Sequence, residues 1–158
     1  MWYRLYILIL SLLGSAYALE PNPDRFCLAE NIYFEASIEP TVGKFAVAQV
    51  VMNRVESPQF PDDACSVIRQ GPLYRNWKGN ELPVPNKCQF SWYCDRKSDK
   101  ILDVKMWREC LRVAEAVLNK ELFDITEGSL WYHSVKVKPY WAASKTKVVQ
   151  VNNHIFYN

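Results

Sequence analysis

The sequence predicts a mainly helical α+β domain with three main helices, a long central loop and a small C-terminal β-hairpin or sheet. Three stretches carry apolar residues at helical spacing, whereas the end of the chain carries short β-like runs separated by turn residues. The 158 residues suffice for one domain with a real core and not for two large ones. We therefore divide the chain into a leader, residues 1–18, and a single domain, residues 19–158.

The leader has the features of a secretory signal peptide. Arg4 precedes an apolar stretch over residues 5–13, and the small-residue pattern Ala16-Tyr17-Ala18 follows. The apolar stretch is shorter than the about 20 residues that a transmembrane helix needs. The alternatives are a buried N-terminal helix and a signal anchor that is not cleaved. A signal peptide predicts a secreted or periplasmic protein that meets the membrane only through this signal.

Charge and cysteine content exclude several classes of partner. The formal net charge is +2 and the Lys and Arg residues form no run, so we expect no nucleic-acid partner. Export permits disulfides, and an odd number of cysteines leaves at least one thiol free or paired between chains. No C-x-x-C pair occurs and the two histidines are far apart, so we expect no metal and no cofactor. We expect one disulfide that uses Cys88 or Cys94, with Cys65 as a candidate partner. The remaining cysteines are Cys27 and Cys110.

Periodicity predicts the positions of the three helices. The first follows the proline-broken stretch 19–26, with Asp24 as a candidate cap, and ends near Ile38 because Pro40 disfavours helix at the preceding residue. The second covers residues 41–56 and is apolar almost all round, which indicates a central, buried helix. The third covers residues 103–120 and is amphipathic.

Polar residues on the apolar faces of the first two helices are candidates for function. Glu35 lies on the apolar face of the first helix, whereas Glu30 falls off it and Glu39 lies at the helix end. Gln49 and Asn53 are four residues apart on one face of the second helix. Buried amides need hydrogen-bond partners, so they are either part of a bonded core or face the same cleft as Glu35.

The rest of the chain is irregular or β-like. Residues 57–100 are predicted to be mostly loop, because they hold five of the nine prolines, and their aromatic residues argue against disorder. Short strands are expected within residues 129–135, 147–151 and 154–157. Asn152 and Asn153 separate the last two runs, and asparagine tolerates a positive φ, so a hairpin turn is expected there.

The position of Glu35 suggests general acid chemistry. Burial disfavours the charged form of a carboxyl group and raises its pKa, which suits a group that protonates the leaving oxygen of a glycosidic bond. The alternative is a structural glutamate paired with an arginine or a helix cap. Sugar rings stack on flat aromatic side chains, which lie in loop or strand-edge segments at Trp92, Tyr93, Trp131, Tyr132, Tyr140 and Trp141. A nucleophilic cysteine or serine is disfavoured because its signatures are absent.

Five segments match the pattern of one family. "YFEASIEP" over residues 33–40 has the form aromatic-x-Glu-Ala-x-x-Glu-Pro, and residues 43–55 continue as Gly-x-x-Ala-Val-x-x-Val-x-x-Asn-Arg-Val. "QFSW" over residues 89–92 and the closing "LWYHSVKVKPYWA" and "VVQVNNHIFYN" also match. Together these segments resemble the cell-wall hydrolase domain of the spore-cortex-lytic enzyme family, the SleB/CwlJ-like hydrolases. The chain departs from the pattern at Asn152 and Arg96, where relatives often carry glycine.

The resemblance implies a lysozyme-like fold and an enzyme that cleaves peptidoglycan glycan strands. It places Glu35 at the position of the catalytic acid and base of a lytic transglycosylase, which cuts the MurNAc–GlcNAc bond and yields anhydro-muropeptides. The alternatives are a hydrolytic muramidase and, in a different class, a peptidoglycan-binding module without activity. We further expect a monomer, and a phage-encoded lysis enzyme is one possible source. Candidate substrate-binding residues are Glu39, Gln49, Asn53, Gln89, Phe90, Ser91, Trp92, Tyr132, His133 and Trp141.

Overall fold

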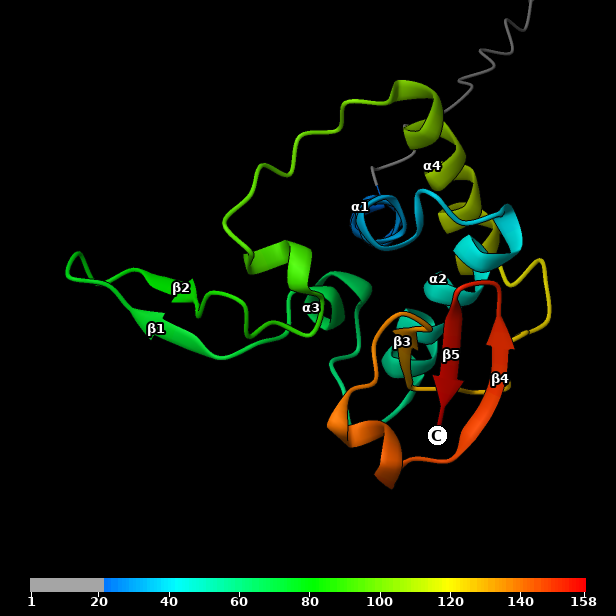
Figure 1. Cartoon of the computed structure of the whole chain (residues 1–158). Helices are drawn as coiled ribbons and strands as arrows, with labels where there is room; N and C mark the ends of the chain where they lie inside the picture. Colours follow the sequence, from blue (N-terminus) through cyan, green and yellow to red (C-terminus); the bar gives the residue numbers. More distant parts are fainter. Residues whose placement is uncertain (1–21) are drawn as a thin grey trace, which may run out of the picture.

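The structure, a computed structural model, describes residues 22–158, so the predicted signal peptide lies outside the described residues. Helix α1 (Pro23–Ala36) and helix α4 (Val104–Leu118) lie side by side over helix α2 (Thr41–Glu56). A small C-terminal sheet covers another side of α2, and a hairpin projects from the body (Figure 1). The predicted mainly helical α+β class is confirmed. No helix among residues 22–158 is long and apolar enough to cross a membrane.

Helix α1 begins one residue before the predicted cap. The side chain of Asn22 caps the helix by accepting hydrogen bonds from the backbone N–H groups of Asp24 and Arg25, and Pro23 occupies the first helical position. Asp24 instead accepts from the N–H groups of Ala64 and Cys65 at the start of helix α3 (Ala64–Ile68). Asp24 therefore links two helices that are distant in sequence, and its prediction as the cap of the first helix was wrong.

Helix α2 has the predicted bounds and forms the centre of the molecule. Its side chains from Ala46 to Val51 are nearly all inaccessible to solvent, and they pack against α1, α3 and α4 on one side and against Phe156 of the sheet on the other. Full burial of an aliphatic side chain contributes about 1.5–3 kcal/mol. Two cations, Lys44 and Arg54, are also buried in this helix and therefore need partners.

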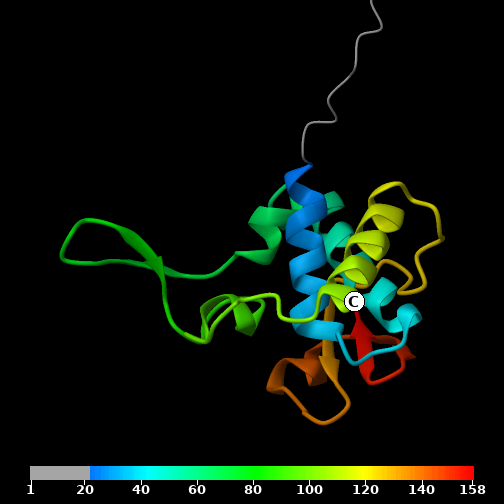
Figure 2. The ribbon, with the colours of Figure 1, turned by 90° about the horizontal axis from the view of Figure 1, so that it is seen from above.

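The segment between α2 and α4 is more regular than predicted. It contains α3, the antiparallel hairpin of β1 (Leu73–Arg75) and β2 (Glu81–Pro83), and the 3₁₀ helix η1 (Ser91–Cys94). The prediction of mostly loop missed the hairpin because its strands have only three residues each and lack the alternation of a half-buried strand. Figure 2 shows that the hairpin projects away from the helices in a second view as well.

The C-terminal region forms the predicted small sheet. Strands β3 (Trp131–Ser134), β4 (Lys147–Val151) and β5 (His154–Tyr157) are antiparallel in the order β3–β5–β4, with the 3₁₀ helix η2 (Tyr140–Ser144) between β3 and β4. Asn152 has a φ of 49° in the β4–β5 turn, as expected of an asparagine there. The sheet brings Tyr132 and His154 to the end of α1.

The structure contains two disulfides instead of one. Cys27 is bonded to Cys65 and ties α1 to α3, whereas Cys88 and Cys94 are bonded to each other. The predicted pairing of Cys65 with Cys88 or Cys94 was therefore wrong. Cys110 is the free thiol and is buried in α4, and burial raises its pKa to about 11. A buried thiol with such a pKa is not suited to nucleophilic chemistry.

Candidate active site

A cleft of about 360 Å³ lies where the end of α1 meets the C-terminal sheet. Its lining comes from four parts of the chain, which are the end of α1 with the turn after it, the end of α2, the start of η1 with the two residues before it, and the sheet with its loops. The lining residues are Glu35, Ile38, Glu39, Arg54, Gln89, Phe90, Ser91, Tyr132, His133, Ser134, Lys136, Val137, Asn153 and His154.

Glu35 is the carboxylate with the properties of a general acid. It is half-buried in the last turn of α1, and one of its oxygens accepts a hydrogen bond of 3.2 Å from the hydroxyl of Tyr132. Burial raises the pKa of Glu35 above its ordinary value, although the bond from Tyr132 and the positive charge of Arg54 oppose the shift. A carboxyl group in this state holds a proton at higher pH than an exposed one.

Tyr132 holds this carboxylate from strand β3. Burial raises the pKa of Tyr132 well above its usual range, and the charge of Glu35 raises it further. The phenol therefore stays protonated and donates to Glu35. Its ring packs edge-on against His154 and is tilted over Phe156, so the hydroxyl is aimed by the sheet and not by a flexible loop.

Arg54 is a buried cation that lines the cleft, and it was not among the predicted site residues. Only 4% of it is exposed, its Nε donates to the carbonyl of Leu130 at 2.7 Å, and its Nη1 has no hydrogen-bond partner within residues 22–158. The guanidinium lies over the rings of Phe60 and Phe90, at 5.2 and 5.3 Å. The signal in the sequence that could have identified it is a cation within the largely apolar second half of this helix.

Glu39 lines the same cleft but is tied to the protein. It is buried, and its two carboxylate oxygens accept from the side-chain amide of Asn153 at 2.9 Å and from the Asn153 backbone N–H at 3.3 Å. Gly43 faces it, and a Cβ atom at Gly43 would stand 2.9 Å from the Glu39 Cβ. Glycine at this position thus leaves room for Glu39.

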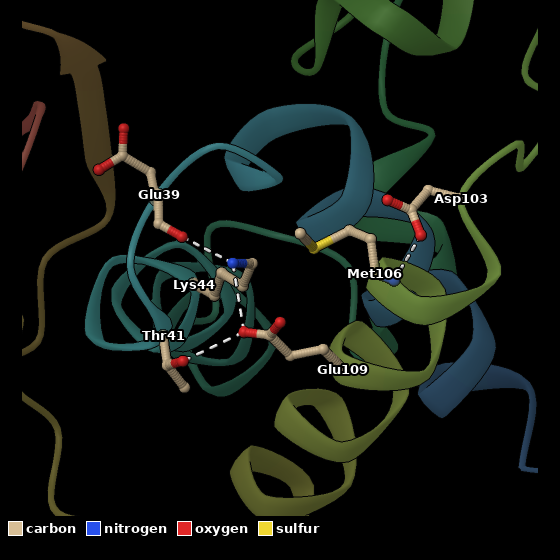
Figure 3. A network of polar contacts seen from close by, with 6 residues as sticks. All are labelled: Glu39, Thr41, Lys44, Asp103, Met106 and Glu109. Atoms are coloured by element: carbon tan, nitrogen blue, oxygen red, sulfur yellow. Dashed lines mark hydrogen bonds and ion pairs between the residues drawn. The ribbon is translucent and has the colours of Figure 1, made fainter.

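A buried lysine holds the turn that carries Glu39. Lys44 donates to the Glu39 carbonyl at 2.6 Å and pairs with Glu109 of α4 at 3.2 Å, and Thr41 donates to the same Glu109 oxygen (Figure 3). The cap of α4, Asp103, lies in the same view. This network joins α2, α4 and the turn at residues 37–40. It therefore holds the backbone of Glu39 in place next to the cleft.

Gln49 and Asn53 lie outside the cleft. Gln49 donates to the Phe123 carbonyl and accepts from the Ile125 N–H, while Asn53 donates to Asp124, Thr126 and the Ser129 carbonyl. Both amides fasten the loop 123–129 to α2. Of the two expectations for these residues, the structure agrees with the bonded core and does not bring them to Glu35.

Some of the predicted aromatic and loop residues line the cleft and others do not. Gln89, Phe90, Ser91, Tyr132 and His133 line the cleft. Trp92 does not line it. Its ring stacks on Phe34 and its indole N–H donates to Asn31 at 2.9 Å. Trp141 packs edge-on against His133 and Tyr157 and supports the wall from outside.

The sequence analysis also missed His154 and Asn153. His154 is buried beside Tyr132, and burial lowers its pKa although the charge of Glu39 opposes the shift, so the imidazole is held neutral at physiological pH. The sequence predicts only that Asn153 lies in a turn and His154 in a strand. Their approach to Glu39 depends on the packing of the β4–β5 turn against the end of α1, which the sequence does not specify.

The sequence matches a known protein family. A sequence model of the family described as Cell Wall Hydrolase matches residues 38–157. The chain belongs to the cell wall hydrolase family. Among curated relatives, the spore cortex-lytic enzyme of Halalkalibacterium halodurans is 51% identical over 41 residues, and that of Bacillus subtilis is 45% identical over 47 residues. These matches cover 26% and 30% of this chain, and only 12% and 15% of the relatives' lengths.

Two solved structures share the fold of this cell wall hydrolase domain. The catalytic domain of the Bacillus cereus SleB protein aligns with a TM-score of 0.59 and 22% identity, covering 85% of this chain and 89% of that one. The catalytic domain of the germination-specific lytic transglycosylase SleB from Bacillus anthracis aligns with a TM-score of 0.61 and 23% identity, covering 88% of this chain and all of that one. The similarity of fold thus extends over most of the described residues.

Proposed function

We propose that this chain is a peptidoglycan lytic transglycosylase that cleaves the MurNAc–GlcNAc bond with Glu35 as general acid and base. The observation that carries the proposal is the state of Glu35, a half-buried carboxyl group with a raised pKa at the wall of a cleft of about 360 Å³. Membership of the cell wall hydrolase family and the fold shared with the B. anthracis lytic transglycosylase support it.

In the first step the proton of Glu35 passes to the glycosidic oxygen. The bond between that oxygen and C1 of MurNAc breaks, and positive charge develops on the ring. Glu35 is left as a carboxylate. The hydrogen bond from Tyr132 and the charge of Arg54 both favour this charged form, so they stabilise the product of proton transfer.

In the second step the same carboxylate acts as the base. It accepts the proton of the muramic acid 6-hydroxyl, whose oxygen bonds to C1 and closes the anhydro ring. The proton returns to Glu35, and no water is consumed. Glu39, the other carboxylate of the cleft, is engaged by Asn153 through both oxygens. That engagement supports a mechanism with one catalytic carboxylate. Because Glu39 also lines the cleft, we assign it a role in orienting substrate.

We assign substrate contact to the predicted residues that line the cleft, namely Glu39, Gln89, Phe90, Ser91, Tyr132 and His133. The assignment does not extend to Gln49, Asn53, Trp92 and Trp141, whose side chains are occupied elsewhere. Two disulfides suit an oxidising compartment. They support a secreted or periplasmic location, and we further propose that the enzyme acts as a monomer.

The test is product analysis by mass spectrometry on purified sacculi. We expect fragments ending in anhydro-MurNAc, each one water lighter than the corresponding reducing-end fragment. Fragments with reducing ends that take up heavy oxygen from labelled water would replace the transglycosylase proposal with a muramidase. Binding to sacculi without any released fragment would refute both and leave a binding module.

A further inference from the structure

The β1–β2 hairpin has an unusual surface for a small exposed element. Trp77 at its tip is 89% exposed, and Leu73, Tyr74 and Leu82 along its strands are also exposed. Lys78 lies over one face of the Trp77 ring, with its Nζ 4.9 Å from the centroid. An isolated two-stranded hairpin gains little stability from its own contacts. Large exposed apolar groups on such an element therefore indicate a binding surface.

The hairpin is held firmly at its base. The Val84 N–H donates to the Pro72 carbonyl at 2.8 Å, and the Gln89 N–H donates to the Gln70 carbonyl at 2.9 Å. A Cβ atom at Gly71 would stand 3.0 Å from the Cα of Cys88, so the two backbone segments lie in close contact. The Cys88–Cys94 disulfide closes the same region. The base is thus clamped to the body, whereas the tip has no tertiary partner among the described residues.

The base of the hairpin is continuous with the wall of the active-site cleft. Gln89, Phe90 and Ser91, which line the cleft, directly follow the disulfide-bonded Cys88. At about 3.3 Å per residue, the five residues from Pro72 to Trp77 place the tip up to about 16 Å beyond the base. A long polymer that leaves the cleft on this side would pass along the hairpin.

The charge of the hairpin region indicates the chemistry of its partner. Between residues 71 and 89 there are three cations, Arg75, Lys78 and Lys87, against the single carboxylate of Glu81. Glu81 pairs with Arg75 at 3.4 Å, and neither Lys78, which lies over Trp77, nor Lys87 forms an ion pair within residues 22–158. Peptidoglycan offers apolar faces of sugar rings for the open side of Trp77 and peptide carboxylates for the lysines.

We infer that the β1–β2 hairpin is a second peptidoglycan-binding surface, which grips polymer outside the cleft through Trp77. This inference rests on the proposed function, because it takes the same polymer as its ligand. The continuity with the cleft wall favours peptidoglycan over an anionic membrane, the other surface that a tryptophan flanked by lysines could contact. Short fragments that fill only the cleft do not reach the tip.

The test measures binding without turnover. In a Glu35→Gln background, cosedimentation with purified sacculi gives a dissociation constant for Trp77→Ala, for Trp77→Phe and for the parent. Loss of one aromatic stacking contact should weaken binding about five- to tenfold, and Trp77→Phe should recover most of it. Phe123→Ala is the matched control, because Phe123 is 79% exposed on a different part of the surface and should leave binding unchanged.

Two results would overturn the inference. One is equal binding of sacculi by Trp77→Ala and the parent. The other comes from the same cosedimentation with phosphatidylglycerol vesicles. If Trp77→Ala weakens binding to the vesicles and not to sacculi, the hairpin is a membrane contact. Trp77 is exposed, so its replacement should leave the circular dichroism spectrum and the melting temperature unchanged. With Glu35 intact, Trp77→Ala should cleave soluble fragments normally. Failure of the wild type to release fragments from sacculi would refute the proposed function but not the binding result, because binding is measured without turnover in the Glu35→Gln background.

Discussion

The two sides of helix α2 carry polar residues in opposite states. On one side the side-chain amides of Gln49 and Asn53 form hydrogen bonds to the loop at residues 123–129. On the other side Arg54 lines the cleft with an unpaired Nη1 and lies near Glu35, which has one hydrogen bond and a raised pKa. A satisfied network stabilises the fold, whereas under-satisfied polar groups around a cavity leave bonds for a substrate.

The pKa values of the carboxylates on the two sides are shifted in opposite directions. Burial raises the pKa of Glu35, and its few bonds do not reverse the shift. Burial also acts to raise the pKa of Asp124, but hydrogen bonds from Thr126, Gly128 and Asn53 outweigh it and hold that pKa below the ordinary value. The number of donors around a carboxylate therefore decides whether burial leaves it prone to hold a proton or to release it.

Glu35→Gln should produce the largest effect on the cleft side. The amide cannot donate a proton to the leaving oxygen, so we expect release of fragments from sacculi to fall about a thousandfold or more. The measurement is the rate of fragment release, with Glu30→Gln as the control because Glu30 does not line the cleft. Near-native activity of Glu35→Gln would refute its assignment as the catalytic acid.

Asn53→Ala should produce the largest effect on the loop side. The change leaves acceptors on Asp124, Thr126 and Ser129 without their shared donor, so we expect the free energy of unfolding to fall by about 2–3 kcal/mol. Denaturant unfolding measures this, and Asn119→Ala, at an exposed helix end, should change it little. Activity per folded molecule should persist. Its loss with stability retained would show that Asn53 serves the cleft.

Gly43→Ala tests whether the helix start keeps Glu39 in place. The new methyl group would meet the Cβ of Glu39 at 2.9 Å, so the turn must move. We expect a loss of about 1–3 kcal/mol in the free energy of unfolding, as overpacking usually causes, and reduced activity because Glu39 leaves Asn153. A crystal structure of the variant checks the displacement. An unmoved Glu39 with normal activity would contradict the assigned role of Gly43.

Tyr132→Phe should have a smaller effect with a distinct signature. It removes the hydrogen bond that favours the charged form of Glu35, so the rate should fall about tenfold, as for loss of one bond to a charged group. The pKa of Glu35 should rise further, which moves the high-pH limb of the activity profile upward. Tyr33→Phe is the control, because its hydroxyl meets the backbone of Leu102 and Asp103 outside the cleft. An unshifted profile would argue against the contact.

The dependence of stability on pH should be the smallest difference between the two sides. The raised pKa of Glu35 means that the folded state holds its proton more tightly, so stability falls as pH rises from the unfolded to the folded pKa. The lowered pKa of Asp124 contributes stability above the unfolded pKa, and this is lost as pH falls through the folded pKa.

Melting temperatures across pH separate these two contributions. Glu35→Gln should melt at or above the wild type at neutral pH and lose that advantage in acid. Asp124→Asn should melt below the wild type at neutral pH and approach it in acid. Parallel curves for both variants would show that the two carboxylates do not differ as described.

Much of the fold followed from local patterns. The bounds of α2 were predicted because Pro40 ends one helix and an apolar run defines the next, and the Asn152 turn was predicted because asparagine accepts a positive φ. The hairpin at residues 73–83 was not predicted because its short strands face solvent. The disulfide pairing was not predicted because it depends on which helices pack together. Cys27 lies next to Cys65 only when α1 packs against α3.

For the candidate site, the sequence determined that Glu35 is a carboxylate on an apolar helical face, and the matching segments gave it a catalytic position. Only the tertiary structure separated Glu35 from the other polar residues of buried helices. Gln49, Asn53 and Arg54 all interrupt the same apolar pattern, and periodicity places each on a face without saying what packs there. The loop 123–129 covers one face and the cleft opens on the other, because burial and bonding depend on contacts between distant segments.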